Sequence, residues 1–157
     1  MEIEIQGTVG EALSQLKAKA ADRRAVHREI GRRMQTRIKM CFRTSTSPYG
    51  EHWPSPVLRQ GAPLRDTGRL MGSIDYLADA EQVQIGTNVR YAPTHQYGAT
   101  IRPKNVRWLK FADAQGGAIF AKEVTIPQRR FLPDEGLPES WQASVSEVIG
   151  EHLNGGD

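Results

Sequence analysis

The chain is poor in the residues that most often build chemical sites. It has a single cysteine, Cys41, so no disulfide can form within it, a composition that fits a reducing cytoplasm. We expect Cys41 to be a small buried hydrophobe on a helix face. The four histidines, His27, His52, His95 and His152, lie far apart and lack the close spacing of metal ligands. We therefore expect no metal site.

Long apolar runs and catalytic signatures are also missing. No stretch approaches the ~18 to 20 apolar residues that a membrane-spanning helix needs. The N-terminus lacks the basic segment and apolar run of a signal peptide. Phosphate-binding loops and the Gly-x-Ser-x-Gly turn do not occur. Ser73, His95 and Asp66 can be selected as a hydrolase triad, but nothing specific in the sequence supports it. We expect no membrane partner, no cofactor and no catalysis, and a small hydrolase is the weaker alternative.

Positive charge is absent from the end of the chain, and negative charge is scarce between residues 17 and 43. No Lys or Arg follows Arg130, whereas residues 17–43 are dominated by Lys and Arg. Opposite charges invite contact between these regions, either within one subunit or between neighbours. The candidate subunit-interface residues are Arg24, Arg28, Arg32, Arg33, Arg37, Glu139, Glu147 and Glu151.

The basic region also permits another interpretation. Phosphate binding requires mainly a density of positive charge, so a nucleic-acid-binding module that uses the basic helix is the main alternative. The sequence shows no aromatic-rich motif of the kind that stacks on RNA bases. We rank contact with protein first because an acidic segment is available in the same chain. A solvated basic face is the least specific interpretation.

Residues 8–43 are predicted to form one long helix. Their apolar residues recur at intervals near 3.6, and Thr8 with Glu11 fits a capping box at the start. Gly31, in the middle of the pattern, marks either a close-packing point or a break. At ~1.5 Å per residue the helix would exceed the needs of a compact domain. We expect part of it to project or to pack on another subunit.

The rest of the chain predicts an α+β fold in a single domain over residues 1–157. Residues 69–132 contain the pattern of a small, mainly antiparallel sheet of about four to five strands. Residues 91–97 form a short inserted helix that Gly98 closes. A C-terminal helix is predicted over residues 138–153, with Pro138 in its first turn.

Two runs in the sheet region are expected to pair as a hairpin. They cover residues 106–111 and 118–126, separated by a glycine-rich turn. Alternation within the first run places Val106, Trp108 and Lys110 on one face.

Short motifs between these elements carry the most specific signal. They combine Gly or Pro with an aromatic or polar residue, at Pro48, Gly50, Trp53, Thr67, Gly68, Leu70, Gly86, Tyr91, Ala92, His95, Gly98, Pro127, Arg129 and Phe131. In their order and spacing they resemble the phage virion morphogenesis family, the tail-completion and neck proteins of Mu-like and P2-like contractile-tailed phages. Arg130 departs from the family pattern, in which a small residue or proline would precede Phe131.

The resemblance implies a structural protein and not an enzyme, so no catalytic residue or cofactor carries over. It implies a homo-oligomeric ring, expected to be hexameric, at the head-proximal end of the tail, where it ends tail-tube growth or joins tail to head. The implied partners are further copies of itself, the tail tube or tail terminator, and head-side neck or connector proteins. DNA would pass through the lumen. The protein would be assembled in the host cytoplasm and would reside in the tail or neck of the virion.

Three motif aromatics lie on connecting segments close to Gly or Pro. They are Trp53, Tyr91 and Phe131. A buried aromatic ring fixes a loop because it removes a large apolar area from water. We expect all three to be core anchors and not ligand contacts.

Overall fold

A computed structural model describes residue 18 and residues 22–57, 59–113 and 115–154. The chain divides into two compact units. Unit 1 contains the described parts of residues 1–34 and 139–157 together with Tyr76–Ile85, and unit 2 contains Gln35–Asp75 and Gly86–Pro138. Helices and strands both contribute, so the α+β class is confirmed. The single domain stays a prediction.

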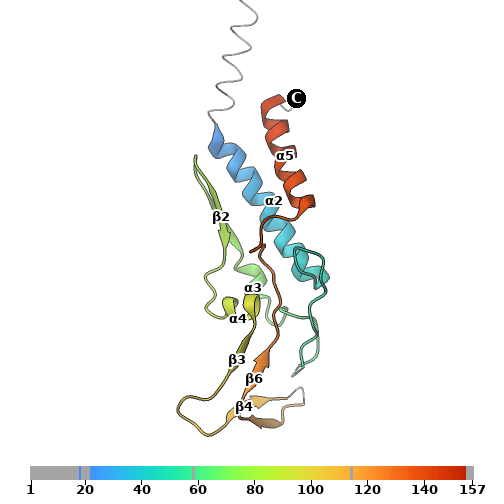
Figure 1. Ribbon diagram of the computed structural model, residues 1–157, viewed down its shortest axis with the longest axis vertical. Helices are drawn as coiled ribbons and strands as arrows, with labels where there is room; N and C mark the ends of the chain where they lie inside the picture. Colours follow the sequence, from blue (N-terminus) through green and yellow to red (C-terminus); the bar gives the residue numbers. More distant parts are fainter. Residues whose placement is uncertain (1–17, 19–21, 58, 114, 155–157) are drawn as a thin grey trace, which may run out of the picture. The chain divides into compact units, whose positions relative to one another are not determined.

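The long basic helix is α2, Arg23–Thr44, drawn in blue to cyan in Figure 1. Its end agrees with the prediction, whereas the expected start with Thr8 and Glu11 lies outside the described residues. Gly31 is a close-packing point and not a break, because α2 is continuous through it. A Cβ atom at this position would collide with the ring of Tyr76.

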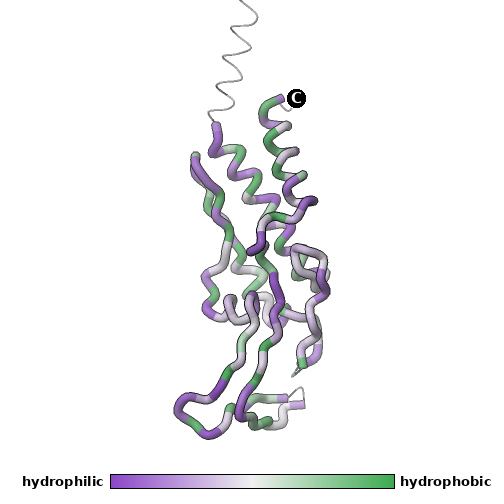
Figure 2. The backbone as a smooth tube through the Cα atoms, viewed as in Figure 1, coloured by the Kyte–Doolittle hydropathy of each residue, from purple (hydrophilic) through white to green (hydrophobic). Residues whose placement is uncertain are grey.

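Unit 1 combines the first part of α2 with α5, Glu139–Asn154. The predicted C-terminal helix is thereby confirmed. Apolar and polar residues alternate along both helices (Figure 2), and the buried side chains include Met34, Trp141 and Val148. Most of the hairpin of β1, Asp75–Ala78, and β2, Val83–Gly86, also belongs to this unit.

Unit 2 is built around aromatic rings. Phe42 lies 5.4 Å from Trp53 and 5.4 Å from Phe131, measured between ring centroids. The largest fully buried side chains of this core are Phe42, Phe131, Ile38 and Ile74. Such aromatic contacts stabilise a core beyond the apolar area that they bury.

Cys41 belongs to the same core and behaves as expected. Its side chain is buried, and burial raises the pKa of the thiol to about 11. A thiol that keeps its proton is a poor nucleophile, so Cys41 acts as a small hydrophobe.

Two short helices lie among the loops of unit 2. Helix α3, Arg69–Gly72, begins after Gly68, whose φ of 76° suits glycine. Helix α4, Ala92–Tyr97, ends at Gly98, as predicted, with φ at 73°. A Cβ atom at Gly98 would lie 3.1 Å from the carbonyl oxygen of Ile126, so this turn requires glycine for space as well as for conformation.

Within the described residues the strands form three two-stranded sheets and not one sheet of four to five strands. Strand β3, Ala99–Ile101, pairs antiparallel with β6, Val124–Ile126. Strand β4, Leu109–Ala112, pairs antiparallel with β5, Ala118–Ala121.

The expected pairing of residues 118–126 as one strand was wrong. The run divides after Ala121, so its second half pairs with β3 while its first half pairs with β4. The break falls at exposed Lys122 and Glu123. It allows Val124 and Ile126 to line a pocket together with residues of β5. None of the described helices is long and apolar enough to cross a membrane.

Candidate functional site

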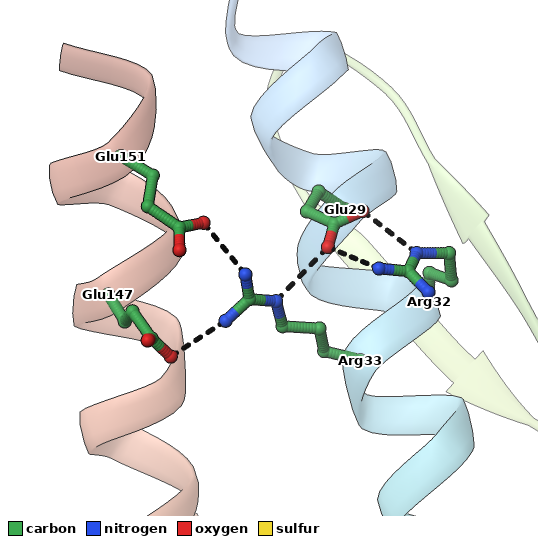
Figure 3. A network of polar contacts seen from close by, with 5 residues as sticks. All are labelled: Glu29, Arg32, Arg33, Glu147 and Glu151. Carbon is green, nitrogen blue, oxygen red and sulfur yellow. Dashed lines mark hydrogen bonds and ion pairs between the residues drawn. The ribbon is translucent and has the colours of Figure 1, made fainter. Parts of the chain in front are cut away.

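Arg33 connects the two helices of unit 1. Figure 3 shows its side chain extending from α2 toward α5, where it donates to Glu147 and Glu151, each at 2.7 Å. Its Nε atom also donates to Glu29 at 3.0 Å, and Arg32 holds the same carboxylate at 2.6 Å. The predicted contact between the basic helix and the acidic end therefore forms within one subunit, one of the two alternatives left open by the sequence.

The spacing along each helix creates this network. Glu29 meets Arg32 and Arg33 one turn later on α2, and Glu147 and Glu151 lie one turn apart on α5. The hydrogen bond from Arg32, with a further one from Arg33, holds the pKa of Glu29 at about 2 although burial opposes this. The same carboxylate raises the pKa of Arg33. Partly exposed pairs contribute only ~0.2 to 1 kcal/mol each, so the network mainly orients the helices.

The ion pairs of this network join Glu29, Arg32, Arg33, Glu147 and Glu151. Arg24, Arg28 and Glu139 are exposed, and Arg37 is half-buried. Their role between subunits stays a prediction. For nucleic acid the arrangement is less favourable than the sequence suggested, because Arg33 would have to leave its carboxylates before binding a phosphate.

The first motif forms a tight loop after α2. The hydroxyl of Ser47 accepts from the backbone N–H groups of Tyr49 and Glu51, and Gly50 has a φ of 92°. Trp53 then enters the core, and its indole N–H donates to the carbonyl of Arg130 at 2.8 Å. Trp53 is therefore a core anchor, as predicted. Phe131 is one as well, because it is almost completely buried.

Two buried polar side chains fasten the later motifs together. The guanidinium of Arg129 donates to the carbonyls of Pro54 and Ser55. The amide of Gln96 donates to the carbonyl of Leu132 at 2.9 Å and accepts from the Leu132 N–H at 3.1 Å. Gln96 was not among the predicted site residues, although it stands inside the motif of α4. Gln96 follows Ala92 by four residues, which places both on the same side of a short helix, and this spacing was the available signal.

Motif residues from separate segments meet around a pocket of unit 2 with a volume of about 800 Å³. Those that line it are Thr67, Gly68, Leu70, Tyr91, His95, Pro127 and Arg129. Strands β4, β5 and β6 supply largely apolar wall residues. Apolar pockets of roughly 300 to 1,000 Å³ are typical of binding sites.

The remaining motif residues have positions outside the pocket lining, in turns, at element ends or in the core. They are Pro48, Gly50, Trp53, Gly86, Ala92, Gly98 and Phe131.

Tyr91 corrects the prediction that it is a core anchor. It is 43% exposed and borders the pocket, with its ring 5.8 Å from that of His95. Its position next to α4 directs the ring to the pocket because Ala92 occupies the buried side. Burial, then the charges of Arg129 and Arg59, lower the pKa of His95, so its neutral form is favoured.

The hairpin of β4 and β5 presents a second surface, which the sequence analysis did not single out. Lys110 lies opposite Phe120 in the strand register, and its Nζ atom is 6.0 Å from the centre of that ring. The Nζ atom of Lys122 is 5.4 Å from the centre of the Trp108 ring. All four side chains are exposed. The alternation of Trp108 and Lys110 on one predicted face was the available signal.

Metal or hydrolytic chemistry finds no support in the part of the chain that the structure describes. No group of three or more His, Cys, Asp and Glu residues there could hold a metal ion. The hydroxyl of Ser73 contacts Thr87 and the carbonyl of Leu70, while the Nδ1 atom of His95 is buried without a hydrogen-bond partner. The arbitrary Ser73, His95 and Asp66 set is therefore not connected as a triad.

Comparison with known proteins agrees with the motifs. The family model described as the phage virion morphogenesis family matches residues 5–154. "Mu-like prophage FluMu G protein 2" of Haemophilus influenzae is 31% identical over 155 residues, which cover 98% of this chain and 96% of that protein. No solved structure matches the chain.

Proposed function

Because the chain belongs to the phage virion morphogenesis family, we propose that it acts in tail completion or head–tail joining. In this role it forms a ring, expected to be hexameric, at the head-proximal end of the tail. The coarser conclusion follows from family membership itself: the protein has a structural role in phage morphogenesis and is a virion-associated protein assembled in the host.

The observation that carries the proposal is the family match over almost the whole chain. The relative's name adds a Mu-like prophage origin for that protein, consistent with a contractile-tailed phage. The motifs also serve structure in this chain, since Arg129, Gln96 and Trp53 fasten loops to one another. A site built for packing suits a structural subunit better than an enzyme.

A ring requires that one patch of a subunit meets a different patch of the next. The described sheets each have two strands, so their outer edges are available for pairing across subunits. Exposed strand edges invite such pairing and are otherwise an aggregation hazard. Several large apolar side chains are also exposed in unit 2, which supports burial against neighbours.

Electron microscopy of a phage that lacks this protein tests the proposal. Unjoined heads and tails are expected if the protein joins them, and abnormally long tails if it ends tube growth. Labelled protein should lie at the head-proximal end of purified tails. Light scattering should give an assembly of about six times the 17.5 kDa chain mass, alone or with the tail partner. A monomer at every concentration, together with absence from particles, would reject the proposal.

A further inference from the structure

The β4–β5 hairpin carries an exposed face on which aromatic and cationic side chains alternate. Phe120 is 59% exposed and Trp108 is 40% exposed. Lys110 and Lys122 lie beside these rings at cation–π distance. Large exposed rings are the residues that most often dominate the energy of a protein interface. This face therefore has the composition of a contact surface.

The surroundings of this face are basic. The nearby cations are Arg102, Lys104, Arg107, Lys110 and Lys122. The carboxylates are already engaged: Glu123 pairs with Arg102 at 2.9 Å, and Asp113 accepts from the backbone of the β4–β5 turn. A partner for this surface should be acidic and should carry an apolar side chain for the rings.

One segment of the same chain has this chemistry. Residues 134–137 contain exposed Asp134 and Glu135, followed by Leu137, which is 38% exposed. The carboxylate of Glu135 also pairs with Arg130 of its own subunit at 2.8 Å, so Asp134 is the carboxylate that the segment offers first. The hydroxyl of Tyr49 accepts from the N–H of Glu135 and donates to the carbonyl of Gly136, so the segment is held in place. A preorganised segment loses less conformational entropy on binding.

We propose that the β4–β5 hairpin face of one subunit docks on residues 134–137 of the neighbouring subunit. The inference rests on the proposed ring and names the contact that builds it. Both surfaces belong to unit 2, and the chain leaves β6 away from the hairpin before it reaches the acidic segment (Figure 1). Two different patches on one subunit give a head-to-tail contact, which closes into a ring when the rotation permits.

A nucleic acid fits this face less well than an acidic protein segment. Base stacking needs open ring faces, whereas lysine ammonium groups already lie over Trp108 and Phe120. Duplex DNA would meet this face chiefly through its phosphates, which bind the lysines and leave the rings exposed. In an acidic segment that contains Leu137, carboxylates can pair with the lysines while the leucine packs against the rings.

Charge reversal on each surface tests the docking. Lys110→Glu with Lys122→Glu should weaken self-association at least about tenfold, as should Asp134→Lys with Glu135→Lys. The four changes combined should restore part of the association. A matched control is Arg65→Glu with Arg90→Glu, which reverses two exposed charges elsewhere in unit 2. It should leave the assembly mass unchanged. Thermal unfolding of every variant checks that the fold is retained.

The outcomes separate this inference from the proposed ring. The double variant Lys110→Glu with Lys122→Glu could form rings as stable as those of the wild type. This result would overturn the docking and leave the proposed function standing. Absence of any wild-type assembly, alone or in particles, would overturn both. Loss of DNA retention with unchanged assembly would also overturn the docking and would assign the hairpin face to nucleic acid.

Discussion

Units 1 and 2 are closed by different interactions. In unit 2, Phe42, Trp53 and Phe131 meet ring against ring in the core. In unit 1, Arg33 joins two helices through carboxylates that remain partly exposed to water. Aromatic burial is not weakened by charge screening and contributes several kcal/mol per side chain. Exposed ion pairs contribute little and are screened by salt. The two units should therefore respond to different perturbations.

The largest expected effect separates buried from exposed rings within unit 2. Phe131→Ala should lower the free energy of unfolding by ~3 to 5 kcal/mol, because the ring is only 1% exposed and leaves a cavity. Phe120→Ala is the matched control and should change it by less than ~0.5 kcal/mol. Urea unfolding measures both. Similar losses for the two variants would show that the hairpin ring is part of the core.

A pair of glycines tests packing within unit 1. Gly31→Ala should cost ~1 to 3 kcal/mol, since the new methyl group would collide with Tyr76. Gly150→Ala in α5 meets nothing within 4 Å and should stabilise the helix by up to ~1 kcal/mol. In thermal unfolding we expect a lower midpoint for Gly31→Ala and a higher midpoint for Gly150→Ala. A stabilising Gly31→Ala would show that α2 and β1 pack less closely than described.

Removing the central cation tests the ionic closure of unit 1. Arg33→Met should cost about 1 kcal/mol at low salt and less at high salt, because it removes partly exposed pairs. The control is Arg102→Met in unit 2, whose single pair with Glu123 is more exposed and should contribute ~0.5 kcal/mol or less. Urea unfolding at two salt concentrations compares them. A salt-independent loss at Arg33 would mean that it acts through packing.

Acid should affect unit 1 through Glu29. The pKa of Glu29 falls from 4.5 to about 2 in the folded chain. As pH falls, the Glu29 carboxylate is therefore protonated in the unfolded chain before it is protonated in the folded chain. The stabilisation is complete above about pH 4.5 and is lost between there and about pH 2. Glu29→Gln should flatten the stability profile in this window. An NMR titration that finds an unshifted Glu29 would contradict the network.

The smallest expected effect concerns His95 in unit 2. Burial and the charges of Arg129 and Arg59 hold its pKa below 6.5. As pH falls, the imidazole of His95 is therefore protonated in the unfolded chain before it is protonated in the folded chain. The free energy of unfolding consequently decreases as pH falls from 6.5. His95→Gln should remove this slope, and NMR titration of the wild type should show the lowered value. A raised pKa would mean that a carboxylate, such as pocket-lining Asp66, meets the imidazole.

Local patterns were sufficient for much of the fold. The 3.6-residue period predicted the end of α2 and the extent of α5, because the apolar residues on one side of a helix recur once per helical turn along the sequence. Gly98 was predicted to close α4 because few residues other than glycine adopt its φ. The order of the loop motifs was also sufficient to identify the family to which the chain belongs.

Tertiary structure alone decided the choices that depend on distant partners. Strands 118–121 and 124–126 look like one run, but they pair with different strands because their neighbours in space differ. Tyr91 and Phe131 belong to similar motifs, yet only Phe131 finds a closed apolar environment. Arg33 had acidic candidates in its own chain and in neighbours, and the approach of α5 brought Glu147 and Glu151 to it. Sequence determines which surfaces each element offers, whereas packing over long separations determines which of them meet.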